Sequence, residues 1–149
     1  MEQAGDRHDS ARGRSGPVGD INGNGLLDVV VTDTDYGAGV GHLYWFEQTA
    51  GGRWIRHAVG GQTGALHSLD VADFDRDGRL DIVTGAHRGH GLRTVVWQNT
   101  DGGRNWVPYR VASGRESHLG AQAVDVDGDG YLDIVSIAWE HPPAGPSVA

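Results

Sequence analysis

Three copies of one acidic nonapeptide recur along this chain at a nearly constant spacing. They begin at Asp20, Asp73 and Asp125, so successive copies start 53 and 52 residues apart. Each copy has oxygen-bearing side chains at positions 1, 3, 5 and 9 and a glycine at position 6. A period of about 50 residues is the mark of a fold that stacks one structural unit repeatedly. The repeat therefore restricts this chain to repeat architectures.

The oxygens within each copy are arranged as a hard cation requires. Alternate side chains of a tight loop can turn inward, and glycine at position 6 permits the sharp reversal that wraps them around an ion. The carbonyl of position 7 and the carboxylate of position 9 would complete the shell. Carboxylates packed this closely repel one another without a cation, so the pattern predicts Ca²⁺ loops. Solvated turns are the alternative, and three copies in fixed register argue against it.

The composition indicates that the acidic residues serve these loops. Ten of the 20 acidic residues lie in the three copies, and without them the net charge of −8 would become +2. The remainder of the chain has neither a nucleic-acid footprint nor a polybasic membrane patch. We therefore expect no nucleic-acid partner and no membrane span. The chain has no cysteine, which excludes disulfides and thiolate zinc sites.

The segments between the loops are predicted to be β-strands. A short apolar run follows each loop, then an alternating segment with a tryptophan, a glycine-rich hairpin and two further strand-like segments. No stretch shows a sustained helical period. We predict an all-β fold of β-propeller blades, each with four antiparallel strands and an acidic loop between two strands of one blade. The chain would supply two near-complete blades and half of a third.

These residues resemble the FG-GAP/VCBS repeat family of calcium-loop β-propellers. The resemblance rests on the acidic loops, on Trp45 and Trp54 in the first unit, and on a histidine before each later loop, and it covers roughly residues 17–140. It implies that Ca²⁺ binds through the side chains at positions 1, 3, 5 and 9 and the carbonyl at position 7. The implied ligands are Asp20, Asn22, Asn24, Leu26 and Asp28 in the first loop, Asp73, Asp75, Asp77, Arg79 and Asp81 in the second, and Asp125, Asp127, Asp129, Tyr131 and Asp133 in the third.

The first loop departs from the pattern. Asn22 and Asn24 replace two carboxylates, so only the first and ninth positions are charged. We therefore expect two strong calcium sites, in the second and third loops, and one weaker site in the first.

The chain divides into a leader over residues 1–16, repeats over 17–140 and a tail over 141–149. The repeat units are expected at about 17–60, 61–113 and 114–140. The leader has no apolar run, so it is neither a signal peptide nor a membrane helix, and leader and tail are predicted to be disordered or flexible. Because family propellers carry more blades than this, we expect a piece of a longer propeller or a protomer that self-associates.

Histidines and aromatic residues are the other candidates for a functional site. His67 and His118 recur before the later loops, which favours a structural role over a catalytic one. Trp45, Trp54, Trp97 and Trp106 also recur, which favours packing between neighbouring blades over stacking on sugar rings. Tyr36 lies in an unrepeated loop and is the better candidate for ligand binding.

The expected function is that of a noncatalytic, calcium-stabilised module for binding or self-assembly, outside the cell or on its surface. Millimolar extracellular calcium would fill such loops, whereas resting cytosol would not. The resemblance implies a glycan or an extracellular protein as partner. Nucleophile and phosphate-binding motifs are absent, and Glu47, Glu116 and Glu140 cannot be paired as acid and base. Two alternatives remain: a structural subunit of an extracellular fibre, or part of a polysaccharide lyase or dehydratase, for which His57, His67, His87 and His118 would be the residues to suspect.

Overall fold

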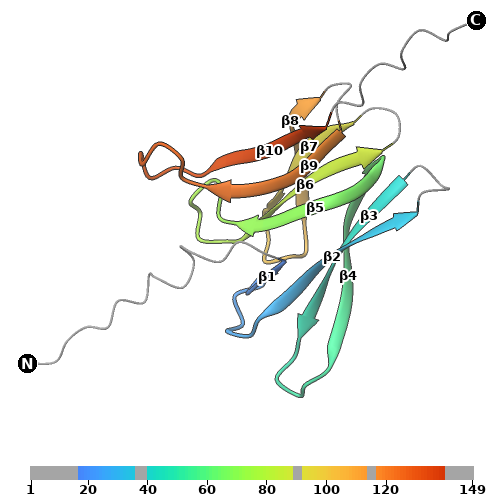
Figure 1. Ribbon diagram of the computed structural model, residues 1–149. Helices are drawn as coiled ribbons and strands as arrows, with labels where there is room; N and C mark the ends of the chain where they lie inside the picture. The colour runs from blue at the N-terminus through green and yellow to red at the C-terminus, as the bar shows by residue number, and fades with distance from the viewer. Residues whose placement is uncertain (1–16, 36–39, 89–91, 114–116, 140–149) are drawn as a thin grey trace, which may run out of the picture.

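The computed structural model describes residues 17–35, 40–88, 92–113 and 117–139, which form three antiparallel β-sheets and no helix (Figure 1). Blade 1 consists of β1 (Val18–Gly19), β2 (Asp28–Asp35), β3 (Val40–Gln48) and β4 (Trp54–Thr63). Blade 2 consists of β5 (Ala65–Ala72), β6 (Asp81–Arg88), β7 (Arg93–Asn99) and β8 (Trp106–Ser113). Half-blade 3 consists of β9 (Ser117–Val124) and β10 (Asp133–Trp139).

The predicted all-β architecture of four-stranded blades is thus confirmed, and the sheets do not close into a ring. Within each complete blade the strands lie side by side in sequence order. Successive sheets pack through their first strands, because β5 contacts β2 and β3, and β9 contacts β5 and β6. The short runs of β-branched residues suit strands whose two faces are both covered by a neighbouring sheet.

The main hydrophobic core lies between blade 1 and blade 2. Blade 1 contributes residues from its loop, β2 and β3, and blade 2 contributes residues from β5, β6 and β7. The buried members are Ile21, Val30, Leu43, Trp45, Leu66, Val71, Ile82, Val95 and Trp97. A smaller core of Val83, Val96 and Ala121, with Phe74 and Ile134 packed against it, joins blade 2 to half-blade 3.

Two of the tryptophans lie in the main core, but they are not equivalent in the repeat. Trp45 pairs with Val30 in blade 1, whereas the residue that pairs with Val83 in blade 2 is Val96. Trp97 is therefore one position out of register with Trp45 and lies on the opposite face of its own blade. Both side chains reach the same core because their blades face each other. The prediction of packing between blades is confirmed for this pair, and the assumption that they recur at one repeat position is wrong.

The other two tryptophans are equivalent but differ in burial. Trp54 pairs with Gln48, and Trp106 pairs with Asn99. Trp106 packs against the main core, while Trp54 is 50% exposed. The prediction that Trp54 packs between blades is therefore wrong in this structure, because in the described part of the chain no sheet covers that face of blade 1.

Several predicted candidates cannot be placed. Tyr36, Glu116 and Glu140 lie outside the described residues, and so does the side chain of His118.

Candidate metal centres

Each acidic loop connects the first two strands of its sheet. Loop 1 (residues 20–28) joins β1 to β2, loop 2 (residues 73–81) joins β5 to β6, and loop 3 (residues 125–133) joins β9 to β10. The glycine at position 6 adopts a left-handed φ that side chains disfavour. These φ values are 85° for Gly25, 87° for Gly78 and 85° for Gly130.

A repeated set of hydrogen bonds folds each loop around its own carboxylates. The backbone N–H of position 6 donates to the carboxylate of position 1, and that of position 7 donates to the side-chain oxygen of position 5. The first bond joins Gly25 to Asp20 (2.8 Å), Gly78 to Asp73 (3.0 Å) and Gly130 to Asp125 (2.9 Å). The second joins Leu26 to Asn24, Arg79 to Asp77 and Tyr131 to Asp129, each at 2.8 Å. The oxygens are thus turned toward the inside of each loop.

Loops 2 and 3 each gather three carboxylates. One oxygen each from Asp73, Asp75 and Asp77 lie within 4.8 Å of one another, and Asp125, Asp127 and Asp133 form a similar group. Two oxygens that bind one Ca²⁺ at about 2.3–2.6 Å are at most about 5 Å apart. Each group could therefore hold one Ca²⁺ of its own, because its oxygens are suitably spaced and are the hard ligands that Ca²⁺ prefers.

The ninth position behaves differently in the complete blades. Asp28 is fully buried, and its two oxygens accept the backbone N–H groups of Ile21 (3.0 Å) and Gln48 (2.9 Å). Asp81 is 1% exposed and accepts the equivalent N–H groups of Phe74 (3.2 Å) and Asn99 (2.8 Å). Each carboxylate therefore joins its loop to the end of the third strand of its blade. Asp28 and Asp81 do not belong to the three-carboxylate groups.

Asp133 has only half of this arrangement. It accepts the N–H of Val126 at 3.0 Å, and it is exposed, because half-blade 3 has no third strand among the described residues. It joins the carboxylate group of its loop instead.

Burial changes the acidity of the two buried carboxyls. Desolvation raises the pKa of Asp81 to about 6, against the lowering effect of the N–H groups of Asn99 and Phe74, and the charges of Asp75 and Asp77 add to the rise. Desolvation also raises the pKa of Asp28, with smaller opposing effects from its two backbone donors.

In loop 1 the two asparagines use their amide groups as donors. Asn22 Nδ2 donates to Glu47 Oε1 at 3.0 Å, and Asn24 Nδ2 donates to the carbonyl of Gln48 at 3.4 Å. The loop is thus attached to the end of β3 by side-chain amides. The other oxygen of Glu47 is 2.8 Å from His57 Nε2.

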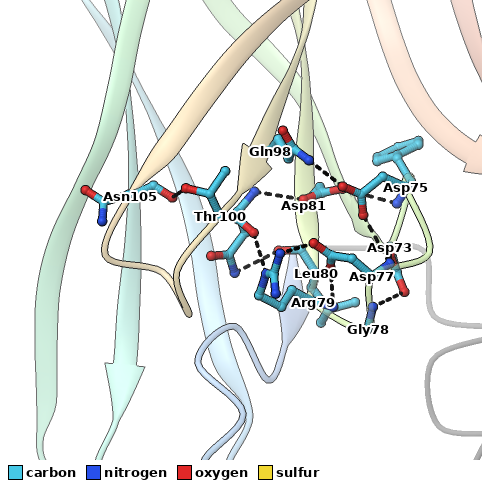
Figure 2. A network of polar contacts seen from close by, with 12 residues as sticks. Asp73, Asp75, Asp77, Gly78, Arg79, Leu80, Asp81, Gln98, Thr100 and Asn105 are labelled. Atoms are coloured by element: carbon cyan, nitrogen blue, oxygen red, sulfur yellow. Dashed lines mark hydrogen bonds and ion pairs between the residues drawn. The ribbon is translucent and has the colours of Figure 1, made fainter.

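Loop 2 makes contacts of the same kind with the end of β7 (Figure 2). Gln98 Nε2 donates to Asp75 Oδ2, and Arg79 Nη2 forms an ion pair with Asp77 Oδ2. Arg79 Nε also donates to the carbonyl of Asn99 at 2.7 Å. Gln98 and Glu47 occupy equivalent positions in their blades. In blade 1 the loop residue Asn22 donates to Glu47, whereas in blade 2 Gln98 donates to the loop residue Asp75.

The strand-end residues are the functional positions that sequence reasoning missed. Glu47 and Gln48 end β3, and Gln98 and Asn99 end β7, at a constant offset of 51 residues. Asn99 is fully buried, and its Nδ2 donates to the carbonyl of Ile21 in loop 1 at 2.9 Å. It therefore connects the two blades. The repeated pair of polar residues at a strand end was the available signal.

The histidines with described side chains are spread over separate contacts. The ring of His57 stacks on Trp45 with centroids 4.3 Å apart, and the rings of His67 and His87 meet edge to face at 4.7 Å. Among the described residues, no group of three or more potential metal ligands includes a histidine.

A groove of about 360 Å³ lies between blade 2 and half-blade 3. Its lining includes the aromatic rings of Phe74 and Tyr109 and the apolar side chain of Leu132. Two members of the metal-centre network, Asp75 and Gln98, also reach it.

Comparison with known proteins identifies the repeat. A family model described as FG-GAP-like repeat matches residues 20–84, and one described as FG-GAP repeat matches residues 65–107. No curated protein and no solved structure gives a significant match. The described residues contain no helix long and apolar enough to cross a membrane. With three repeated loops and blades of four antiparallel strands, the chain belongs to the FG-GAP repeat family.

Proposed function

We propose that this protein is a noncatalytic FG-GAP module that Ca²⁺ stabilises and that serves binding or self-assembly outside the cell. The observation that carries the proposal is the grouping of three carboxylates in loop 2 and again in loop 3. Each group concentrates negative charge at the turn of a hairpin. A divalent cation there would remove the repulsion and hold the two strands of the hairpin at a fixed separation.

The proposed ligands combine the grouped carboxylates with the further positions that the family resemblance implies. Asp73, Asp75 and Asp77 would bind it in loop 2, and Asp125, Asp127 and Asp133 in loop 3, with the position-7 carbonyls of Arg79 and Tyr131 and the carboxylates of Asp81 and Asp129 as further ligands. Loop 1 would bind weakly, because Asn22 and Asn24 supply neutral oxygens and already contact β3.

A noncatalytic role is supported by how the suspected residues are used. His57 stacks on a core tryptophan and contacts Glu47, so both side chains are part of the blade 1 scaffold. FG-GAP repeats are in general noncatalytic and are typical of extracellular proteins. Calcium at extracellular concentration would fill sites of modest affinity.

The partner is proposed to be another blade, a second copy of the chain, an extracellular protein or a glycan. The groove between blade 2 and half-blade 3 supports a contact surface, because aromatic rings and carboxylates lie together there. Binding of a polysaccharide panel and oligomeric mass in calcium would distinguish these partners.

Calcium titration by isothermal calorimetry tests the metal assignment. The full chain should bind Ca²⁺ at two strong sites, in loops 2 and 3, and at one weaker site in loop 1. Asp127→Ala should remove one strong site, while Asp33→Asn, which neutralises an exposed carboxylate outside the loops, should leave the stoichiometry unchanged. Absence of any calcium heat, or an equal effect of both substitutions, would contradict the proposal.

A further inference from the structure

Loop 2 carries a cation of its own, which loop 3 lacks. Arg79 stands at position 7, where loop 3 has Tyr131 and loop 1 has Leu26. Its guanidinium forms an ion pair with Asp77 and donates Nε to the carbonyl of Asn99 at 2.7 Å (Figure 2). A positive charge thus lies beside the carboxylate group and connects it to the end of β7.

The second carboxylate of the group also has a side-chain donor. Gln98 donates a hydrogen bond to Asp75, and Arg79 pairs with Asp77. Two of the three clustered carboxylates in loop 2 therefore have a side-chain donor from within the protein. Loop 1 has less negative charge to balance, because Asn22 and Asn24 stand where loop 2 has two carboxylates. In the described part of the chain, the carboxylates of loop 3 receive hydrogen bonds only from backbone N–H groups of that loop.

We propose that Arg79 is a built-in counter-ion that holds loop 2 closed when calcium is absent and competes with calcium for this loop. Its competition with calcium rests on the proposed function, whereas its role in the calcium-free protein does not. Arginine suits this position because its planar group can bind a carboxylate and a carbonyl at once.

As a consequence, the parts of the molecule differ in how much they need calcium. Arg79 fixes the end of β7 at Asn99, and Asn99 in turn donates to Ile21 in loop 1. The joint between blade 1 and blade 2 therefore keeps its polar contacts without calcium. Loop 3 has no internal cation, so half-blade 3 depends on the metal, and loop 3 fills before loop 2 as calcium rises.

Two arginine substitutions in loop 2 test this assignment. Arg79→Gln removes the proposed counter-ion. Arg76→Gln removes the same charge from the same loop, but Arg76 lies over the ring of Tyr131, 4.8 Å from its centroid, and forms no ion pair with Asp77. Both variants are made in the full chain and, for calorimetry, also with Asp127→Ala to suppress loop 3.

With loop 3 suppressed, Arg79→Gln should bind calcium about tenfold more tightly than its parent, as expected for removing one charge a few ångströms from a divalent ion. Arg76→Gln should change the affinity less than about threefold, because its charge is farther away and screened by solvent. In calcium-free buffer Arg79→Gln should melt several degrees below Arg76→Gln.

Equal affinities for the two variants would overturn the competition, and equal calcium-free melting temperatures would overturn the counter-ion role. If neither parent nor variant binds calcium, the competition and the proposed calcium function both fail, while the calcium-free melting comparison still decides the role of Arg79. If the parent binds calcium and the variants do not differ, the function stands and only this inference fails.

Discussion

Asp28 and Asp81 have a structural role that is separate from the metal role implied for their position in the repeat. The FG-GAP resemblance implies a calcium ligand at position 9, and in the structure the carboxylates of Asp28 and Asp81 each accept one N–H from the loop and one from the third strand. A carboxylate oxygen has two lone pairs, so these hydrogen bonds leave capacity for a metal. The same residue can thus join loop, strand and ion.

The raised pKa of Asp81 predicts how calcium-free stability depends on pH. The folded-state pKa of about 6 lies above the ordinary value of 3.8. The carboxyl of Asp81 therefore keeps its proton to a higher pH in the folded protein than in the unfolded chain. Its contribution to the free energy of unfolding is fully present below the ordinary pKa and is lost as the pH rises through about 6. The raised pKa of Asp28 acts in the same direction.

Calcium-free protein should consequently melt at a higher temperature at about pH 5 than at about pH 7. Circular dichroism melts of protein desalted after chelation measure this difference. Asp81→Asn, which resembles the protonated acid in shape, should reduce the difference. A higher melting temperature at the neutral pH would show that this burial effect does not govern calcium-free stability.

At the scale of the elements, the close packing of blade 1 against blade 2 requires a glycine on β4. A Cβ atom added at Gly60 would lie 2.3 Å from Cζ3 of Trp97. The indole lies in the main core, where it cannot move aside without displacing its neighbours. The close approach of β4 to Trp97 therefore leaves no room for a side chain at Gly60.

Gly60→Ala should accordingly lower the free energy of unfolding by about 1–3 kcal/mol. Gly51→Ala is the matched control, because its added Cβ would meet only Thr49 Oγ1, at 4.0 Å. Urea denaturation followed by tryptophan fluorescence compares the two variants. Equal free energies of unfolding for the two variants would mean that the interface between the blades can accommodate the added methyl group.

The elements also show what the sequence could predict. The loops and the four strands of a blade follow from local chemistry, since spacing of oxygens and alternation of apolar residues are visible along the chain. The faces of Trp45 and Trp97 were not visible in this way, because a shift of one residue moves a strand side chain to the opposite face of its sheet.

The partners of the loops were similarly hidden. Gln98 and Asn99 reach loop 2 from the end of β7, about 20 residues away in sequence, and their role depends on strand pairing rather than on a motif. Aligning the repeat units at the offset of 51 residues would have shown that both blades end their third strand with two polar side chains.

At the scale of the whole molecule, loops 1 and 2 are each covered by the sheet that follows, whereas in the described part of the chain no sheet follows loop 3. Ile21, at position 2 of loop 1, is 1% exposed, Phe74 in loop 2 is partly buried, and Val126 in loop 3 is 65% exposed. Tyr131 and Ile137 on half-blade 3 are also exposed, and so is Trp54 on the outer face of blade 1. We therefore expect further blades or a second copy to cover these faces, as uncovered apolar surface favours association.

The central claim is that clustered carboxylates in the loops bind calcium and that this stabilises the blades. The melting temperature of the full chain in excess calcium and in excess chelator tests it most directly. A ligand present at about 100 times its dissociation constant adds about 2.7 kcal/mol per site, which corresponds to a rise of roughly 5–10 °C for a domain of this size. We predict a rise of at least this size when calcium is restored. An identical melting temperature in calcium and in chelator would contradict the account.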